Sequence, residues 1–468
     1  MSGDVPFGFG QPRDPDDESR DAAGSGSGGS LPPGFGAGGF PGAAGSQGPQ
    51  DFDMANLGAA LEQLGAMLQS SGGDSTGPVN WDLALDGARK AIVEAGDPIV
   101  PDAQRRAVED AVGLAEVWLD PATEFPSTAG TALSWSRSEW LTETMPAWQK
   151  IISPIAEQMQ ATMQTMMPDP DALDGGAMGL PEGLPPELAA AMGPLLGMAK
   201  AMGSAMFGMQ VGNGLAALAG EVVSSSDIGI PLTSGGHTAL VPSNILAFSE
   251  GLDVPDSDVL VYIALREAAH QRLFAHVPWL RARVEGALDA YAGGVKVDED
   301  RIASALEGVD LQNPEALQNA MSSGVFEQED TPEQQAALAR LETLLALVEG
   351  WVDDVVDAGA AERLPSYDRL RETLRRRRAT GGPAEKTFAN LVGLELRPRR
   401  LREAAQLWER LRSTGGIEAR DALWGHPDLL PTADDLDDLD GFLDRSNDFD
   451  TSELDGSGSK EEPEGEGT

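Results

Sequence analysis

The most informative absence in the sequence is cysteine, since none of the 468 residues is one. Without thiols the chain has no disulfide framework, no thiolate zinc ribbon, no iron–sulfur cluster and no cysteine nucleophile. Histidine is also scarce, and the four in the chain are His237, His270, His276 and His426. A metal site would therefore have to combine a few imidazoles with carboxylates.

Positive charge is the second shortage. Lysine and arginine number 33 against 76 aspartates and glutamates, which gives a formal net charge of -43. Nucleic acids and anionic membranes attract the opposite sign, so the composition predicts neither as a partner. The first 20 residues carry aspartates where a secretory signal needs a cationic start and an apolar run. We therefore expect an acidic, cytoplasmic protein.

Both ends of the chain are poor in the apolar residues that a folded core needs. Residues 1–50 contain 14 glycines and 7 prolines, and the last 35 residues are dominated by acids. Such composition is typical of disorder and of tails that contact protein partners. We predict a disordered Gly/Pro-rich arm (1–55), a short amphipathic helix with a linker (56–77), a folded domain (78–432) and a disordered acidic tail (433–468).

The short amphipathic helix rests on four leucines, Leu57, Leu61, Leu64 and Leu68, at spacings of 4, 3 and 4. This period places them on one helical face, and Gly72–Gly73 ends the pattern. The helix could dock on the folded domain or on a partner.

The folded domain has a mainly helical hydrophobic pattern. Strand signals are limited to Thr238–Val241, with Gly229–Leu232 as a possible partner strand. The predicted helices are Trp81 to Ala95, Pro101 to Trp118, Ser136 to Met167, Pro186 to Ser224, Ser257 to Ala275, Trp279 to Ala292, Thr331 to Ala358, Tyr367 to Arg378 and Arg399 to Leu411. The expected fold class is mainly α with a small β-sheet, in two lobes around the helix that carries Glu267 and His270.

Two segments have unusual composition. Leu188 to Gly220 holds seven glycines and a single charge, Lys200, which favours a tightly packed buried helix over a membrane span. Residues 363–420 carry 15 arginines and lysines against 7 acids. Their positive charge either pairs with the acidic body and tail of this chain or meets an anionic partner.

The strongest local pattern is the predicted helix between Asp256 and Pro278. Asp256 or Ser257 can cap its start, and Pro278 ends it. Glu267 and His270 lie three residues apart and share an apolar face. A buried carboxylate and imidazole need partners. The pattern leaves open whether these partners are each other, an arginine from elsewhere, or a metal or catalytic cleft.

The register of this helix is close to the zinc peptidase motif H-E-x-x-H, in which two imidazoles bind zinc and the glutamate is the general base. Glu267 and His270 match the base and the second ligand, whereas Arg266 stands in place of the first histidine. In the longer motif H-E-x-x-H-x-x-G-x-x-H, His276 takes the third-ligand position and Leu273 replaces the glycine. A continuous helix would turn His276 away from His270, so His276 is either a ligand or a surface residue.

A second candidate ligand is Glu349, which lies in the apolar helical pattern from Leu344 to Val356. Its placement resembles the downstream glutamate ligand of gluzincin-type peptidases. The alternative is a helix acid that pairs with an arginine.

Several segments together resemble a known family. They are Val241–Ile245, Leu265–Phe274, Val277–Leu280, Glu395–Arg402 and Ala422–Pro431. They are similar to the zincin-like bacterial family of zinc-dependent metalloproteases and hydrolases, over about Trp81 to Pro431. The resemblance implies a mainly helical zincin-like fold with Glu267 and His270 at its centre.

Two functions follow from these patterns. In the first, the protein is a zinc-dependent metallopeptidase or related hydrolase of peptides or proteins, with Glu267 as base and His270, His276 and Glu349 as metal ligands. In the second, the protein is a catalytically degenerate zincin scaffold that acts in binding or assembly, with Arg266 holding an anionic group or a carboxylate where the metal would lie.

Overall fold

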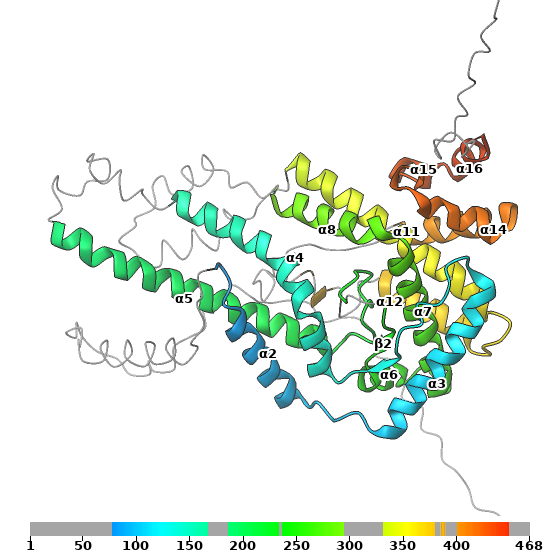
Figure 1. The fold of residues 1–468 in the computed structure, drawn as a ribbon, viewed down its shortest axis with the longest axis horizontal. Helices are drawn as coiled ribbons and strands as arrows, with labels where there is room; N and C mark the ends of the chain where they lie inside the picture. The colour runs from blue at the N-terminus through cyan, green and yellow to red at the C-terminus, as the bar shows by residue number, and fades with distance from the viewer. Residues whose placement is uncertain are drawn as a thin grey trace, which may run out of the picture. The chain divides into compact units, whose positions relative to one another are not determined.

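The structure is a computed structural model that describes residues 77–166, 186–233, 236–293, 331–379, 384, 386–387, 389 and 400–448. The Gly/Pro-rich arm, the leucine segment 57–68 and the last twenty residues lie outside this part of the chain. In the described residues the fold is mainly helical, as predicted (Figure 1). The longer helices are α2 (Trp81–Ala95), α3 (Asp102–Leu119), α4 (Arg137–Met166), α5 (Pro186–Ala219), α7 (Asp256–His276), α8 (Pro278–Gly293), α11 (Pro332–Ala360), α12 (Tyr367–Ala379) and α14 (Leu401–Ala422). The shorter ones are η1 (Asp120–Ala122), α6 (Pro242–Ser249), η3 (Leu423–Gly425), η4 (Pro427–Leu429), α15 (Ala433–Asp437) and α16 (Leu439–Asp448).

The boundaries of the central helices follow from local chemistry. α7 begins after Pro255 with two acids in its first turn, which suit the positive end of the helix dipole. It ends where Pro278 follows Val277, because the residue before a proline disfavours helical backbone. α11 begins at a capping box in which Thr331 and Gln334 satisfy each other's backbone N–H groups.

The small sheet has two short parallel strands, β1 (Leu133–Ser134) and β2 (Ala239–Leu240). The predicted strand at Thr238–Val241 is therefore present, but its predicted partner Gly229–Leu232 is wrong. In that segment Gly229 adopts a left-handed φ of 78°, and Arg281 donates to the carbonyl of Pro231 at 2.7 Å. These features hold the segment against α8 as an irregular loop.

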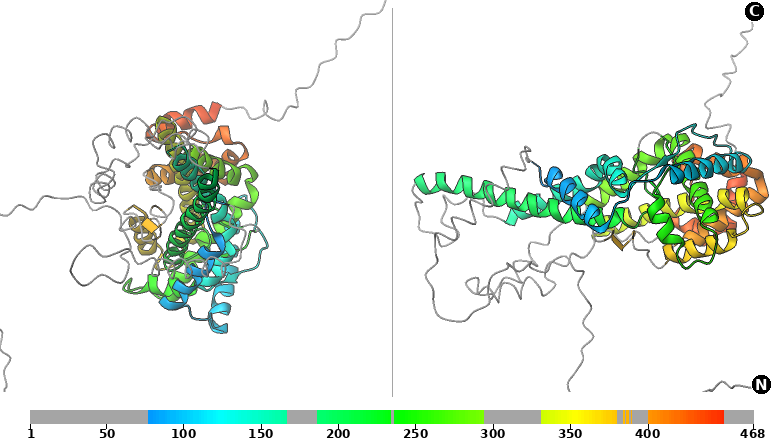
Figure 2. Two further views of the ribbon diagram at one scale, coloured as in Figure 1. Left: turned by 90° about the vertical axis from the view of Figure 1, so that its left-hand side faces the viewer. Right: turned by 90° about the horizontal axis from the view of Figure 1, so that it is seen from below.

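α2 and α5 lie side by side (Figure 2) because glycines let their backbones approach. A Cβ atom at Gly208 would come within 2.5 Å of the Asn80 carbonyl oxygen, and one at Gly212 within 2.4 Å of the Ala84 carbonyl oxygen. This contact explains two of the seven glycines between Leu188 and Gly220. In the described residues, every helix is too short or too polar to span a bilayer.

α7 lies at the centre of the fold, where α3, α6, α8, α11 and α12 all contact it. Its residues from Tyr262 to Phe274 are all buried, the charged ones included. Burial of a helix on every side removes the amphipathic pattern, and it also requires that each polar side chain find a partner within the protein.

The C-terminal part of the chain contains more helix than the sequence pattern indicates. α14 extends eleven residues past the predicted end at Leu411 and kinks at Gly416, whose φ is 83°. The acidic tail, predicted from residue 433, begins instead with α15 and α16. These helices form because Leu436 and Phe442 are buried in the core.

Candidate functional site

Glu349 is the centre of the candidate site. It lies on α11 with 1% of its surface exposed, and three side chains converge on its carboxylate. Arg266 Nη2 lies 2.5 Å from Oε2, and His270 Nε2 lies 3.0 Å from Oε1. Arg378 Nη1, from α12, lies 2.5 Å from the same Oε1. The structure thus brings together Arg266, His270 and Glu349 and adds an arginine that sequence reasoning missed.

His270 is held at both ring nitrogens. Nδ1 lies 2.8 Å from the backbone oxygen of Arg266, and Nε2 faces the Glu349 carboxylate. Both ring nitrogens therefore already have an oxygen partner within the protein.

The charges around Glu349 determine its ionisation. Burial alone would raise the pKa of this carboxyl, but Arg378, His270 and Arg266 outweigh burial and hold the pKa well below its usual range. The carboxylate therefore stays ionised at neutral pH. It is the anion that neutralises a cluster of buried cations.

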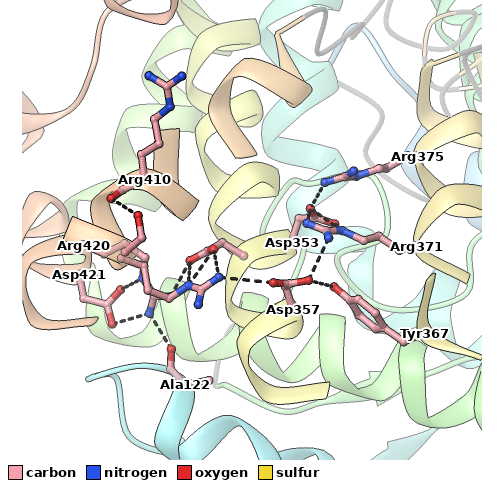
Figure 3. A network of polar contacts seen from close by, with 12 residues as sticks. Ala122, Asp353, Asp357, Tyr367, Arg371, Arg375, Arg410, Arg420 and Asp421 are labelled. Carbon is pink, nitrogen blue, oxygen red and sulfur yellow. Dashed lines mark hydrogen bonds and ion pairs between the residues drawn. The ribbon is translucent and has the colours of Figure 1, made fainter. Parts of the chain in front are cut away.

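The cluster continues along α11 to Asp353, one helical turn away. Arg266 Nη1 lies 3.9 Å from Asp353 Oδ1, while Arg371 and Arg375 on α12 contact Oδ2 at 2.7 and 2.5 Å (Figure 3). Burial raises the pKa of Asp353, and the hydrogen bond and charge of Arg371, with those of the other arginines, lower it overall.

Another acid of α11, Asp354, contacts two arginines of α14. Asp354 accepts hydrogen bonds from Arg412 at 2.9 Å and from the fully buried Arg420 at 2.9 Å. Arg420 also contacts Asp421, its sequence neighbour (Figure 3). In the part of the segment 363–420 that the structure describes, Arg371, Arg375, Arg378, Arg412 and Arg420 thus pair with acids of this chain, which is the first of the two ways that the sequence left open.

Glu267 lies in a different environment, although it precedes His270 by less than one turn of α7. Its carboxylate accepts hydrogen bonds from the hydroxyls of Ser225 and Ser226, from the Ser226 backbone N–H at 3.2 Å and from Gln271 at 2.8 Å. The side chain is 1% exposed. Both of its oxygens accept hydrogen bonds, and the residue fastens the loop after α5 to α7.

His276 does not join this centre. It is exposed in the last turn of α7, where Nδ1 lies 2.9 Å from the Arg272 backbone oxygen and the ring stacks on Phe125 at 5.8 Å. Of its two predicted alternatives, the structure shows a surface position, because α7 continues through Leu273 and turns the ring away from His270. His237 accepts from the Thr131 N–H, and His426 from the Asp428 N–H.

The ligand set of a zinc site is not assembled in this arrangement. Among the residues that the structure describes, no group of three or more His, Asp or Glu side chains is placed to hold a metal ion. Two guanidinium groups contact the carboxylate that would be a ligand, and arginine does not lose its proton to make room for a cation. The residues present do not fit zinc.

Three residues at the centre carry no recognisable sequence signal. Gly229 brings its backbone against Glu349, since a Cβ there would lie 3.2 Å from Oε1. Ser225 and Ser226 reach Glu267 from about forty residues earlier in the chain. Their role depends on tertiary contacts, which neither spacing nor residue type predicts.

The fold and this centre define a mainly helical protein built around a buried R-E-x-x-H helix. A family model described as zincin-like metallopeptidase matches residues 79–443, and the chain belongs to this family. It is similar to a protein from Chloroflexus aurantiacus whose crystal structure is described as that of a candidate hydrolase with a novel fold. The two are 19% identical, with 79% of this chain and 99% of the other covered and a TM-score of 0.55. This likeness establishes the fold alone. The comparison with curated proteins gives no match.

Proposed function

We propose that this protein is a zincin-like family member in which a salt-bridged centre has replaced the metal centre, and that it acts as a binding or assembly protein. The observation that carries this proposal is the double contact of Arg266 and Arg378 with Glu349. The two buried guanidinium groups exclude a metal cation because they repel its charge and because they occupy the carboxylate oxygens that would bind it.

A cavity close to the centre supports a binding role. It has a volume of about 660 Å³ and lies between α4 and α8, with Ile230 and Pro231 in its lining. These residues directly follow Gly229, where an added Cβ atom would lie 3.2 Å from Glu349 Oε1. Ligand sites in proteins have volumes of this order and combine apolar walls with a few polar groups.

The chemistry of the cavity indicates a cationic, partly apolar peptide as its ligand. The apolar lining includes Ile151, Val284 and Leu288. Three of the four charged side chains that line it are acids, and these four are Lys150, Glu157, Glu285 and Asp289. A basic peptide segment would complement this charge.

The alternative function is zinc-dependent hydrolysis of peptides, which the family membership favours. In that function Glu267 is the base, with His270 and Glu349 as ligands, and both Arg266 and Arg378 would have to leave the carboxylate of Glu349. The 3.0 Å separation of His270 and Glu349 is the feature of the structure that speaks for this alternative.

Cleavage of a peptide library by the full chain distinguishes the two functions, with zinc or a chelator present and the digest read by mass spectrometry. We expect the same background cleavage from the native chain and from Glu267→Gln. Zinc-dependent cleavage that the chelator stops and Glu267→Gln lacks would refute the proposal.

Binding of basic peptides from an array tests the positive part of the proposal. We expect the variant Glu285→Lys with Asp289→Lys to lose the peptides that the native chain retains. The matched control, Glu109→Lys with Asp110→Lys, makes the same charge change on the exposed face of α3. Equal loss in both variants would mean that the negative charge of the whole chain, and not the cavity, attracts the peptides.

A further inference from the structure

One face of α5 presents a row of methionines without cover from the rest of the described protein. Met202, Met206 and Met209 are 47%, 64% and 40% exposed. Their spacings of 4 and 3 place them on one side of the helix. Exposed large apolar side chains that gather on one helical face are typical of a contact surface.

The opposite face of α5 is packed against α2. Ser204, Val211 and Leu215 are buried there, and Gly208 and Gly212 touch the α2 backbone. A helix that is apolar all round needs cover all round, and Leu188 to Gly220 contains only one charge. The methionine face therefore lacks the cover that the other face has.

The chain enters the described fold directly on α5. The backbone N–H of Asn80 donates to the Ser204 carbonyl at 3.2 Å, and the Ser204 hydroxyl donates to the Gly77 carbonyl at 3.3 Å. The residues that precede Gly77 therefore begin level with the methionine row along the axis of α5, but on the opposite face, which carries Ser204.

We propose that the leucine segment, Leu57 to Leu68, covers the methionine face of α5 in the same chain. Its four leucines recur at 4, 3 and 4 residues, which matches the period of the methionines. Eight residues, 69–76, connect it to Gly77. An extended chain of that length reaches roughly 26 Å, and a helix with its side chains is roughly 10–12 Å across. The connection is long enough to pass around α5.

The short connection to Gly77 favours the leucine segment over other partners for the methionine face. A segment joined by a short flexible linker reaches an effective concentration of the order of millimolar at its site. A second copy of the chain would have to reach that concentration in solution to compete. Unbranched methionines also adapt to the leucine side chains that they meet.

Methionine oxidation in the full-length protein tests the contact, because hydrogen peroxide converts exposed thioethers to sulfoxides faster than covered ones. The readout is the oxidation rate of Met202, Met206 and Met209, obtained by peptide mapping. We expect Leu61→Asp with Leu64→Asp to raise these rates severalfold. Met145, which is 6% exposed in the core, serves as an internal reference whose rate stays low while the fold is intact.

The matched control is Ala59→Asp with Gln63→Asp, which adds two charges to the opposite face of the same segment. We expect it to leave the three rates unchanged. Equal rates in the native chain and in both variants would overturn the proposal. Protection that disappears on dilution of the native protein would assign the face to a second copy instead.

An engineered disulfide gives an independent test. The native chain has no cysteine, so only the two introduced thiols can form a bond. Leu64→Cys with Met206→Cys should form an intramolecular bond under mild oxidation. Leu64→Cys with Glu109→Cys, on the exposed face of α3, should not. Mainly intermolecular dimers from the first pair would contradict the proposal.

Discussion

Two buried glutamates at the centre of this protein show how differently one fold treats the same side chain. Glu267 on α7 and Glu349 on α11 are each 1% exposed. Glu267 is held by neutral donors, two serine hydroxyls, a backbone N–H and a glutamine amide. Glu349 is held by two arginines and a histidine. The first is a hydrogen-bonded anchor and the second is a counter-ion.

The contrast explains why Glu349, and not Glu267, prevents metal binding at this centre. A carboxylate that neutralises several buried cations cannot be given to a metal without leaving those cations uncompensated. The neutral environment of Glu267 carries no such constraint. Arg266, which replaces the first histidine of the motif, and Arg378, which lies outside the motif, therefore separate this centre from a zinc site.

The largest expected effect is that of Glu349→Gln. Removal of the charge leaves Arg266 and Arg378 buried beside a neutral amide, and loss of one partner from a buried ion cluster typically costs about 3–5 kcal/mol. Urea unfolding measures the loss of stability. The control Glu362→Gln, at an exposed position just past the end of α11, should change stability by less than about 0.5 kcal/mol. Similar small losses in both would show that Glu349 is not the counter-ion of the cluster.

Acid should weaken the Glu349 centre selectively. The folded-state pKa of Glu349 lies below its ordinary value of 4.5, and that of Asp353 below 3.8. The unfolded chain thus binds protons that the folded chain does not, so stability is fully present above about pH 4.5 and falls as the pH drops further. Unfolding free energies measured from neutral to acidic pH should fall less steeply for Glu349→Gln than for the native chain. Parallel pH curves would contradict the assignment.

A smaller effect is expected for Glu267→Gln. The NH2 group of the glutamine would face a hydroxyl of Ser225 or Ser226 that donates to the native carboxylate, so one donor would lose its acceptor. One unsatisfied buried group costs about 1–3 kcal/mol. The same urea experiment gives the value. A loss as large as that of Glu349→Gln would erase the difference between the two centres.

The smallest effect is expected for His276→Ala. The ring is exposed and stacks on Phe125, so its removal should change the unfolding free energy by less than about 1 kcal/mol. Metal content should not change either. A variant that lost a bound metal would return His276 to the ligand set.

The sequence pattern predicts the fold class and the members of the centre better than it predicts their partners. α7 and α11 lie within two residues of their predicted bounds, because long apolar runs with caps and prolines determine helices locally. Arg266, Glu267, His270 and Glu349 follow from position in those helices.

The remaining parts depend on contacts that are distant in sequence. Arg378 is one of four consecutive arginines, and nothing in that run distinguishes the one that reaches Glu349. β1 has only two residues, which is too short for an alternating pattern. α15 and α16 are rich in acids, and their few buried apolar residues became visible only in the packed structure.

Metal content is the most direct test of the central claim that arginines have taken the place of a metal. Plasma mass spectrometry of tag-free native protein, before and after incubation with zinc and removal of excess ion, gives the stoichiometry. We predict that zinc stays far below one ion per chain in both samples. Near-stoichiometric zinc that is lost in His270→Ala would contradict the account and establish a metal site at the R-E-x-x-H helix.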